Sequence, residues 1–331
     1  MTFAELEQKV GKVLAILIAW ERVPAEVLAN LKLAECISIY LQSDDPVISQ
    51  KMAEKALALA ATVDECLDIF DHVYMTGILE KAFNLAKTIE DYLKVYDYLD
   101  VDNPLRTQVF KRIQDLVITV EDALLVFKHT HLSPEIKSFE KALALVKTFA
   151  DAAHVHHSAF PGSEQKEAAL VKMLEMAQTT DDCLEVHKKS RGAEQMALAL
   201  DKALQLASSF ADIFKVYKHS PRFSDQKNQA FSKALEIAST SRECLDLKIQ
   251  SSEDSERELA LAKAIELANS IEGHLAVHYY AGGDESKISL DKALSLANTY
   301  EDCLVIYNSG DGGEPPKRAL EKMKQIWQQS Q

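Results

Sequence analysis

A motif that recurs about every 30 residues constrains the fold of this chain more than any other feature. One position of the motif marks its register and holds all five cysteines. Successive occurrences of this position in the sequence are between 26 residues (from 66 to 92) and 31 residues apart. The ten anchor residues are Cys36, Cys66, Tyr92, Ala123, Ala152, Cys183, Ile213, Cys244, His274 and Cys303. A fixed period of this length predicts a stacked array of supersecondary units rather than one globular core.

Each unit, numbered from its anchor, begins with a segment that reads as one helix, which we call helix A. Apolar residues recur at positions −13, −10, −7 and −6, which is the spacing of one helical face. The small residues at −10 and −6, mostly alanine, leave room for a neighbouring helix to approach closely. Position −11 is basic in all nine complete units: Lys55, Lys81, Arg112, Lys141, Lys172, Lys202, Lys233, Lys263 and Lys292. We expect these cations to pair locally or to lie along the surface.

A second, shorter helix, helix B, is predicted to start just before the anchor. Position −4 is Thr or Ser in nine units, and in eight of them an acid follows three residues later, as in Thr179 and Asp182. This is the capping box, in which the hydroxyl and the carboxylate satisfy backbone N–H groups at a helix start. Because almost no linker separates helix A from helix B, the two are expected to form a tight hairpin. The prolines and glycines fall mainly after helix B.

These patterns predict an all-α fold, an α–α solenoid of about ten units, for which we expect a right-handed superhelix. Residues 1–331 would form one domain, with an N-terminal capping helix at 1–23, repeats at 24–314 and a C-terminal capping helix at 315–331. The architecture resembles the α-solenoid class that includes tetratricopeptide, HEAT and Sel1-like arrays. The tetratricopeptide pattern of Trp, Leu-Gly and Tyr is absent, so the resemblance names a class and no single family. It implies a protein-binding scaffold.

The charge balance narrows the possible partners. Thirty-seven basic and 51 acidic residues give a formal net charge of −14, which disfavours nucleic acid and anionic membranes. No signal peptide and no run of about 20 apolar residues is present. Cysteines at equivalent positions of stacked units would lie about 10 Å apart, too far for disulfides. We therefore expect free thiols and a cytoplasmic location, although delivery into another cell by a non-Sec route stays open.

The residues that could carry chemistry favour a non-enzymatic protein without a cofactor. No phosphate-binding glycine loop or zinc-protease motif occurs, and the cysteines exchange with Ala, Ile and Tyr, as core residues do. Histidines are the exception, because they cluster in the middle of the chain at His129, His131, His154, His156, His157 and His187. An alternative function is therefore metal binding or catalysis by this His129–His187 cluster. A ring that replaces a half-buried tyrosine is the simpler interpretation of the histidines at position +4.

A binding face is expected on helix B and the loop after it, where positions +2 and +5 vary from unit to unit. The central units are locally basic there, and the candidate residues are Lys128, His154, His156, His157, Lys188, Lys215 and Lys218. This patch predicts a protein or peptide partner with an acidic segment. A purely structural or assembly role is a further alternative, and the oligomeric state is left open.

Overall fold

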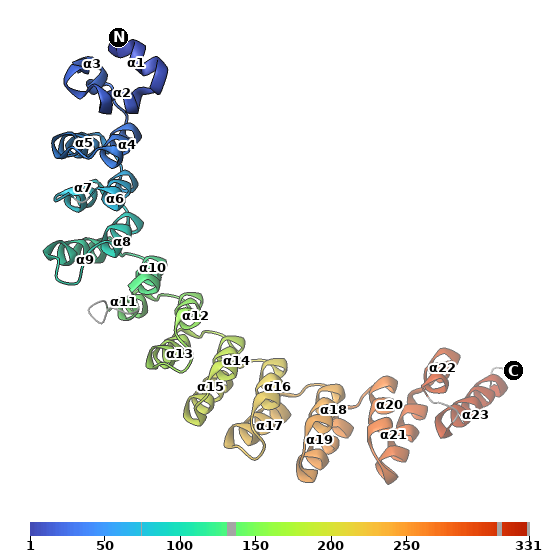
Figure 1. Ribbon diagram of the computed structural model, residues 1–331. Coiled ribbons are helices and arrows are strands. Elements are labelled where there is room, and N and C mark those ends of the chain that lie inside the picture. The colour runs from blue at the N-terminus through green and yellow to red at the C-terminus, as the bar shows by residue number, and fades with distance from the viewer. Residues whose placement is uncertain (74, 131–136, 310–312, 330–331) are drawn as a thin grey trace. The chain divides into compact units, whose positions relative to one another are not determined.

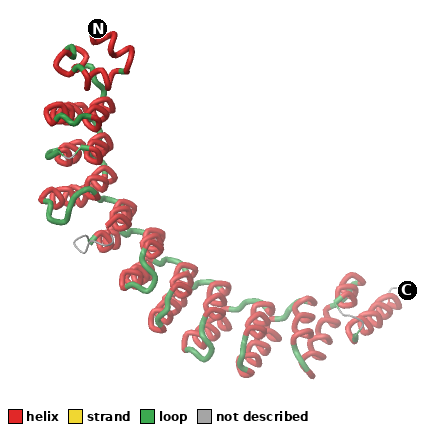
Figure 2. Tube along the Cα trace, in the orientation of Figure 1, coloured by secondary structure: helices red, strands yellow, loops and turns green. Residues whose placement is uncertain are grey.

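The computed structural model of the chain describes residues 1–73, 75–130, 137–309 and 313–329. Helices joined by loops make up this part of the chain, and no strand occurs in it (Figure 2). The predicted all-α fold is confirmed. Contacts between Cα atoms divide the chain into two compact units, Met1–Val146 and Lys147–Gln331, which we call unit 1 and unit 2.

Unit 1 begins with two short helices and a 3-10 turn, where the sequence predicted a single capping helix. Gly11 has a φ of 85°, a conformation that favours glycine, and it ends the first helix. The predicted Thr2 and Glu5 capping box is formed. The elements are α1 (Phe3–Val10), α2 (Lys12–Ile18), η1 (Trp20–Arg22), α3 (Ala25–Ala29), α4 (Leu33–Gln42), α5 (Pro46–Leu59), α6 (Val63–His72), α7 (Ile78–Leu85), α8 (Ile89–Asp97), α9 (Pro104–Leu116), α10 (Val120–Thr130) and α11 (Ser138–Leu145).

Unit 2 continues the alternation of short B helices and longer A helices (Figure 1). Its elements are α12 (Phe149–Ser158), α13 (Glu164–Met176), α14 (Thr180–Lys189), α15 (Ala193–Leu206), α16 (Phe210–His219), α17 (Asp225–Ile237), α18 (Ser241–Gln250), α19 (Asp254–Leu267), α20 (Ile271–Tyr280), α21 (Gly283–Leu296), α22 (Tyr300–Asn308) and α23 (Glu314–Gln329). The last of these is the helix predicted at the C-terminal end.

Each B helix packs most closely on the A helix that follows it, as α14 does on α15 and α18 on α19. The predicted tight hairpin between helix A and the next helix B is therefore wrong in its pairing. The junction between A and B is short but extended: Ala207 and Ser209, between α15 and α16, both have β-region dihedrals. The extended junction after helix A directs the chain away from that helix. The loop after helix B lets the next helix A pack antiparallel to helix B.

Within each unit, B helices contact B helices and A helices contact A helices. In unit 2, α14, α16, α18, α20 and α22 follow one another in one layer, while α15, α17 and α19 do so in the other (Figure 1). Unit 1 has the same B layer in α4, α6, α8 and α10. Contacts between neighbours alone are what a quasi-one-dimensional repeat array requires.

The anchor position lies in the core of both units. All five cysteines are free and buried, as predicted. Burial raises the pKa of Cys183 and of Cys244 to about 11, so both stay protonated thiols. The alanines at −10 pack beside them: Ala203, Ala234 and Ala264 have no exposed surface. A side chain this small allows the helices to approach closely there.

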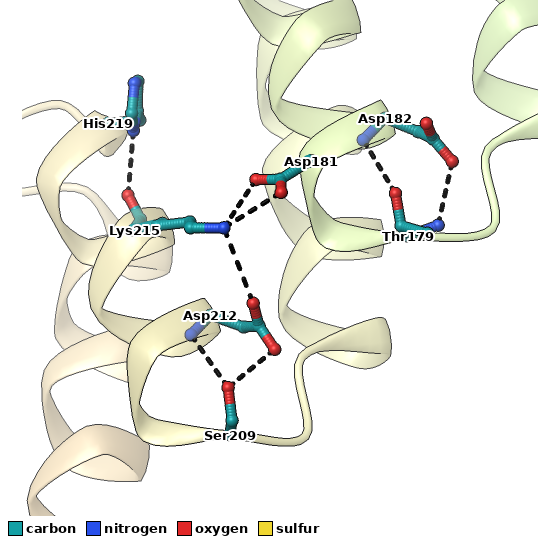
Figure 3. A network of polar contacts seen from close by, with 7 residues as sticks. All are labelled: Thr179, Asp181, Asp182, Ser209, Asp212, Lys215 and His219. Atoms are coloured by element: carbon teal, nitrogen blue, oxygen red, sulfur yellow. Dashed lines mark hydrogen bonds and ion pairs between the residues drawn. The ribbon is translucent and has the colours of Figure 1, made fainter.

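Seven of the eight predicted capping boxes are formed at the starts of the B helices; at α16 the Asp212 N–H donates to Ser209 Oγ, but the Asp212 carboxylate accepts from the Ser209 hydroxyl instead of from its backbone N–H. At α14, the backbone N–H of Asp182 donates to Thr179 Oγ1 (3.1 Å), and the N–H of Thr179 donates to the Asp182 carboxylate (3.0 Å; Figure 3). The same reciprocal bonds occur at Thr62, Thr88, Thr119, Thr148, Thr240 and Thr299. The backbone N–H of Asn298 donates to the Asp302 carboxylate, and that of Lys147 donates to the Asp151 carboxylate. Each hydrogen bond lowers the pKa of the carboxyl that accepts it.

The basic residue at −11 has a role that the sequence did not predict. Lys202 donates to the carbonyl of Leu174 (2.5 Å), which lies in the last turn of the preceding A helix, α13. Lys233 makes the equivalent bond to Leu204 (2.8 Å). Lysines at −11 in three other units bond to the equivalent carbonyl: Lys81 to Leu57, Lys141 to Gln114 and Lys263 to Leu235. Lys55 bonds to the carbonyl of Ala29, the last residue of α3. The last carbonyls of a helix lack intrahelical partners and carry its negative dipole end, so these cations join successive A helices.

Candidate protein-binding surface

The exposed basic residues of the predicted patch lie at position +5, in the last turns of successive B helices. His157 lies in the last turn of α12, Lys188 in that of α14 and Lys218 in that of α16, and all three side chains are exposed. Basic residues are favoured at a helix C-terminus because they face the negative end of its dipole. The Lys218 ammonium lies 4.3 Å from the centroid of the Phe214 ring, which fixes its position over α16.

His156 is buried, which corrects its assignment to the binding face. Its exposed fraction is 6%, and that of His187, at the same +4 position, is 7%. Burial lowers the pKa of His156 to about 4, and its Nε2 atom has no hydrogen-bond partner. The ring is therefore neutral near pH 7 and fills a place that aromatic side chains occupy in other repeats. The sequence predicts a ring that replaces a half-buried tyrosine; His156 and His187 do take the ring position, but they are more buried than expected.

Lys215 contributes an ion pair between repeats. Its ammonium lies 2.9 Å from both carboxylate oxygens of Asp181 on α14 and 3.8 Å from Asp212 on its own helix (Figure 3). The hydrogen bond to Asp181 raises the pKa of Lys215. Lys94 forms the equivalent pair with Asp64 (2.6 Å) in unit 1. A lysine at +2 thus reaches the acid at −2 of the preceding unit, and it stabilises the B layer.

The remaining candidates belong to different parts of the molecule. His154 is exposed on α12 in unit 2, whereas Lys128 is exposed on α10 in unit 1. Both residues take part in further interactions within the structure. The candidate surface that can be described as one piece is therefore the B layer of unit 2, with His157, Lys188 and Lys218 at its basic end.

Among the described residues, no group of three or more His, Cys, Asp and Glu side chains gathers where a metal ion could be held. His131 lies outside the described residues. His129 is exposed on α10 in unit 1, while His187 is buried on α14 in unit 2. His187 Nδ1 lies 3.3 Å from the carbonyl oxygen of Met196, as expected for a ring that is held in place by packing.

Exposed apolar residues near the basic end were not chosen from the sequence. Ile249 on α18 and Tyr279 on α20 occupy position +5, and their exposed fractions are 48% and 76%. Phe160 and Phe223, in the loops after α12 and α16, are also exposed. Selecting variable positions by charge alone overlooked these side chains. Their variability between repeats was visible in the sequence.

No family model matches the chain, and no curated protein matches it. One similar solved structure is described as a "Circular tandem repeat protein with novel repeat topology and enhanced subunit contact surfaces". The sequences are 13% identical, the match covers 98% of this chain and 74% of that chain, and the TM-score is 0.14. A TM-score this low supports no conclusion about function.

In the described residues, no helix is both long and apolar enough to cross a membrane.

Proposed function

We propose that this protein is a non-enzymatic scaffold whose B layer in unit 2 binds an acidic segment of a protein partner. One observation carries the proposal: His157, Lys188 and Lys218 occupy the same exposed position of successive B helices, in a chain whose net charge is −14. A local basic row on an acidic protein attracts an acidic segment, while the remaining surface repels most other polyanions.

The structure of the B layer supports a rigid surface. Lys215 joins α14 to α16, and the hydroxyls of Thr179 and Ser209 accept backbone hydrogen bonds that hold the starts of these two helices. A peptide that binds side chains on such a layer loses little free energy to reordering of the scaffold. The five buried thiols fit a reducing compartment such as the cytoplasm.

The proposal is tested with a fluorescein-labelled peptide of Glu, Gly and Ser, whose binding to the full chain is followed by fluorescence anisotropy. Lys188→Glu with Lys218→Glu should weaken binding at least about tenfold, because two attractive charges become repulsive. Binding should also weaken as salt is added.

The matched control is Lys287→Glu with Lys324→Glu. It makes the same change in net charge at exposed lysines of α21 and α23, in the A layer. The control should retain affinity within about twofold, since those charges lie on other helices and are screened. An equal loss in both double variants would mean that net charge alone attracts the peptide, and the proposed surface would be wrong.

A further inference from the structure

The exposed +5 position of unit 2 changes its chemistry along the array. It begins with His157, Lys188 and Lys218 on α12, α14 and α16, and continues with Ile249 and Tyr279 on α18 and α20. The B helices from α14 to α20 contact one another in this order (Figure 1). One row of equivalent positions, which we call the +5 row, therefore has a basic half and an apolar half.

The apolar half is held in a defined arrangement. The Lys248 ammonium donates to the carbonyl of Tyr280 (2.8 Å), which joins the last turns of α18 and α20. Tyr279 packs edge-on against Tyr280, with ring centroids 5.0 Å apart. Ile249 and Tyr279 are the residues next to this contact, so their backbones are fixed relative to each other. Preorganised exposed apolar side chains lose little entropy when a partner covers them.

We infer that the +5 row binds an extended peptide whose acidic residues contact the basic half and whose apolar residues contact Ile249 and Tyr279. The inference rests on the proposed function and adds the order of residues in the partner. Packed helices lie about 10 Å apart, and a polyproline II chain advances about 3.1 Å per residue with three residues per turn, so that every third side chain faces the same side. Successive contacts therefore fall about three residues apart, which gives the pattern acid, x, x, acid, x, x, acid, x, x, apolar, x, x, apolar.

Single-stranded nucleic acid is the other polyanion that a row of cations and aromatic rings can bind. The apolar half and the net charge of −14 favour the peptide. An oligouridylate is therefore included as a probe. The inference is wrong if the oligouridylate binds more tightly than the peptide and if, of the double variants, only Lys188→Glu with Lys218→Glu weakens its binding.

The experiment compares two fluorescein-labelled peptides of about 15 residues, the length that spans five repeats in a polyproline II conformation. The ordered peptide has Glu and then Leu and Trp at every third position, with Gly and Ser between. In the acid-only peptide, Ser replaces Leu and Trp. The ordered peptide should bind the full chain about tenfold more tightly, because it also buries apolar surface.

Two double variants test whether this gain in affinity comes from the apolar half of the row. Ile249→Ser with Tyr279→Ser should reduce the affinity of the ordered peptide to that of the acid-only peptide, and should leave the acid-only peptide unaffected. Exposed substitutions of this kind change stability little, which circular dichroism can check. Ile288→Ser with Leu320→Ser, exposed on α21 and α23, provides the matched apolar control and should leave both affinities unchanged.

The outcomes separate the inference from the proposed function. The apolar half has no role if the two peptides bind equally well, or if Ile249→Ser with Tyr279→Ser changes the affinity of neither peptide. The inference then fails, while the proposed basic surface stands. If neither peptide binds at low salt, the proposed function fails together with the inference.

Discussion

The two units use the same repeat, but the A helix α7 of unit 1 is shorter than the A helices of unit 2. In unit 1, α7 has 8 residues, and it belongs to the repeat in which only 26 residues separate the anchors 66 and 92. In unit 2, α15 has 14 residues. The capping box at Thr88 is nevertheless formed in the same way as the box at Thr179. The junction from A to B thus keeps its geometry, and helix A itself takes up the change in length, because the segment before α7 (residues 73–77) is no shorter than the segment before α15 (residues 190–192).

A second difference lies at position +4, where unit 1 has only aromatic rings and unit 2 has mainly polar side chains. The residues are Tyr40, Phe70, Tyr96 and Phe127 in unit 1, and His156, His187, Tyr217, Lys248, His278 and Tyr307 in unit 2. The two buried tyrosines have similar surroundings. A cation from the next A helix lies over each ring, Arg106 at 4.2 Å from the centroid of Tyr96 and Lys227 at 4.1 Å from that of Tyr217.

The largest expected effect is that of Tyr217→Ala, which should destabilise unit 2 by about 3 to 5 kcal/mol. Tyr217 has no exposed surface, and its hydroxyl donates to Glu256 (2.9 Å), so the substitution leaves a cavity and a buried carboxylate without its partner. Urea denaturation measures the loss. Hydrogen exchange should show reduced protection around α16 to α19, with α4 to α8 unchanged.

The control is Tyr279→Ala, which removes a largely exposed tyrosine and should cost less than about 0.5 kcal/mol. A loss of protection spread evenly over both units after Tyr217→Ala would contradict the division of the chain into separately stabilised parts.

A smaller effect is expected from pH, and it should be confined to unit 2. Burial lowers the pKa of His156 from 6.5 to about 4, so the folded state binds fewer protons than the unfolded state between these values. The free energy of unfolding should therefore fall, by about 1 to 3 kcal/mol, as the pH decreases from 6.5 to 4. Above 6.5 the ring is neutral in both states and the pH dependence from this residue ends.

His156→Tyr places at this position the residue that other repeats have there. The variant should lose the part of the pH dependence between 6.5 and about 4.5 that His156 causes, while His274, whose pKa burial also lowers, keeps its part. The capping carboxyls, whose pKa values are lowered, still destabilise the protein at lower pH. Chemical denaturation of both proteins at several pH values measures this. An unchanged pH dependence in the variant would assign the effect to other groups.

Features of the fold that involve residues close in sequence could be predicted from the sequence. A capping box spans three residues, and an apolar helical face spans seven, so Thr179, Asp182 and Ala203 could be placed from the pattern around them. The B helices and the buried cysteines were predicted correctly for this reason. The pairing of helix B with the next helix A could not be read from linker length, because the direction of a short extended junction depends on backbone dihedrals.

Contacts between repeats were harder to predict. Lys202 meets Leu174 across 28 residues, and Lys215 meets Asp181 across 34. A basic residue at −11 in every complete unit was the available signal, since a solvated position rarely requires one charge type throughout. For the binding face, charge alone indicated Lys188 and Lys218, whereas exposure was needed to add Ile249 and to remove His156.

The smallest effect tests the contacts between A helices at two lysines of unit 2. Lys202 donates to carbonyls of the preceding A helix, Leu174 and Glu175, while Lys172, at the same position of α13, pairs with the Glu175 carboxylate of its own helix (2.9 Å). Lys202→Met should cost about 1 kcal/mol, since a charge-assisted bond to orphan carbonyls is lost. Lys172→Met should cost about 0 to 0.5 kcal/mol, as for an exposed pair along one helix. Urea denaturation compares the two. Equal losses would show that the contact between A helices adds nothing beyond an ordinary surface ion pair, and that the basic residue at −11 has another cause.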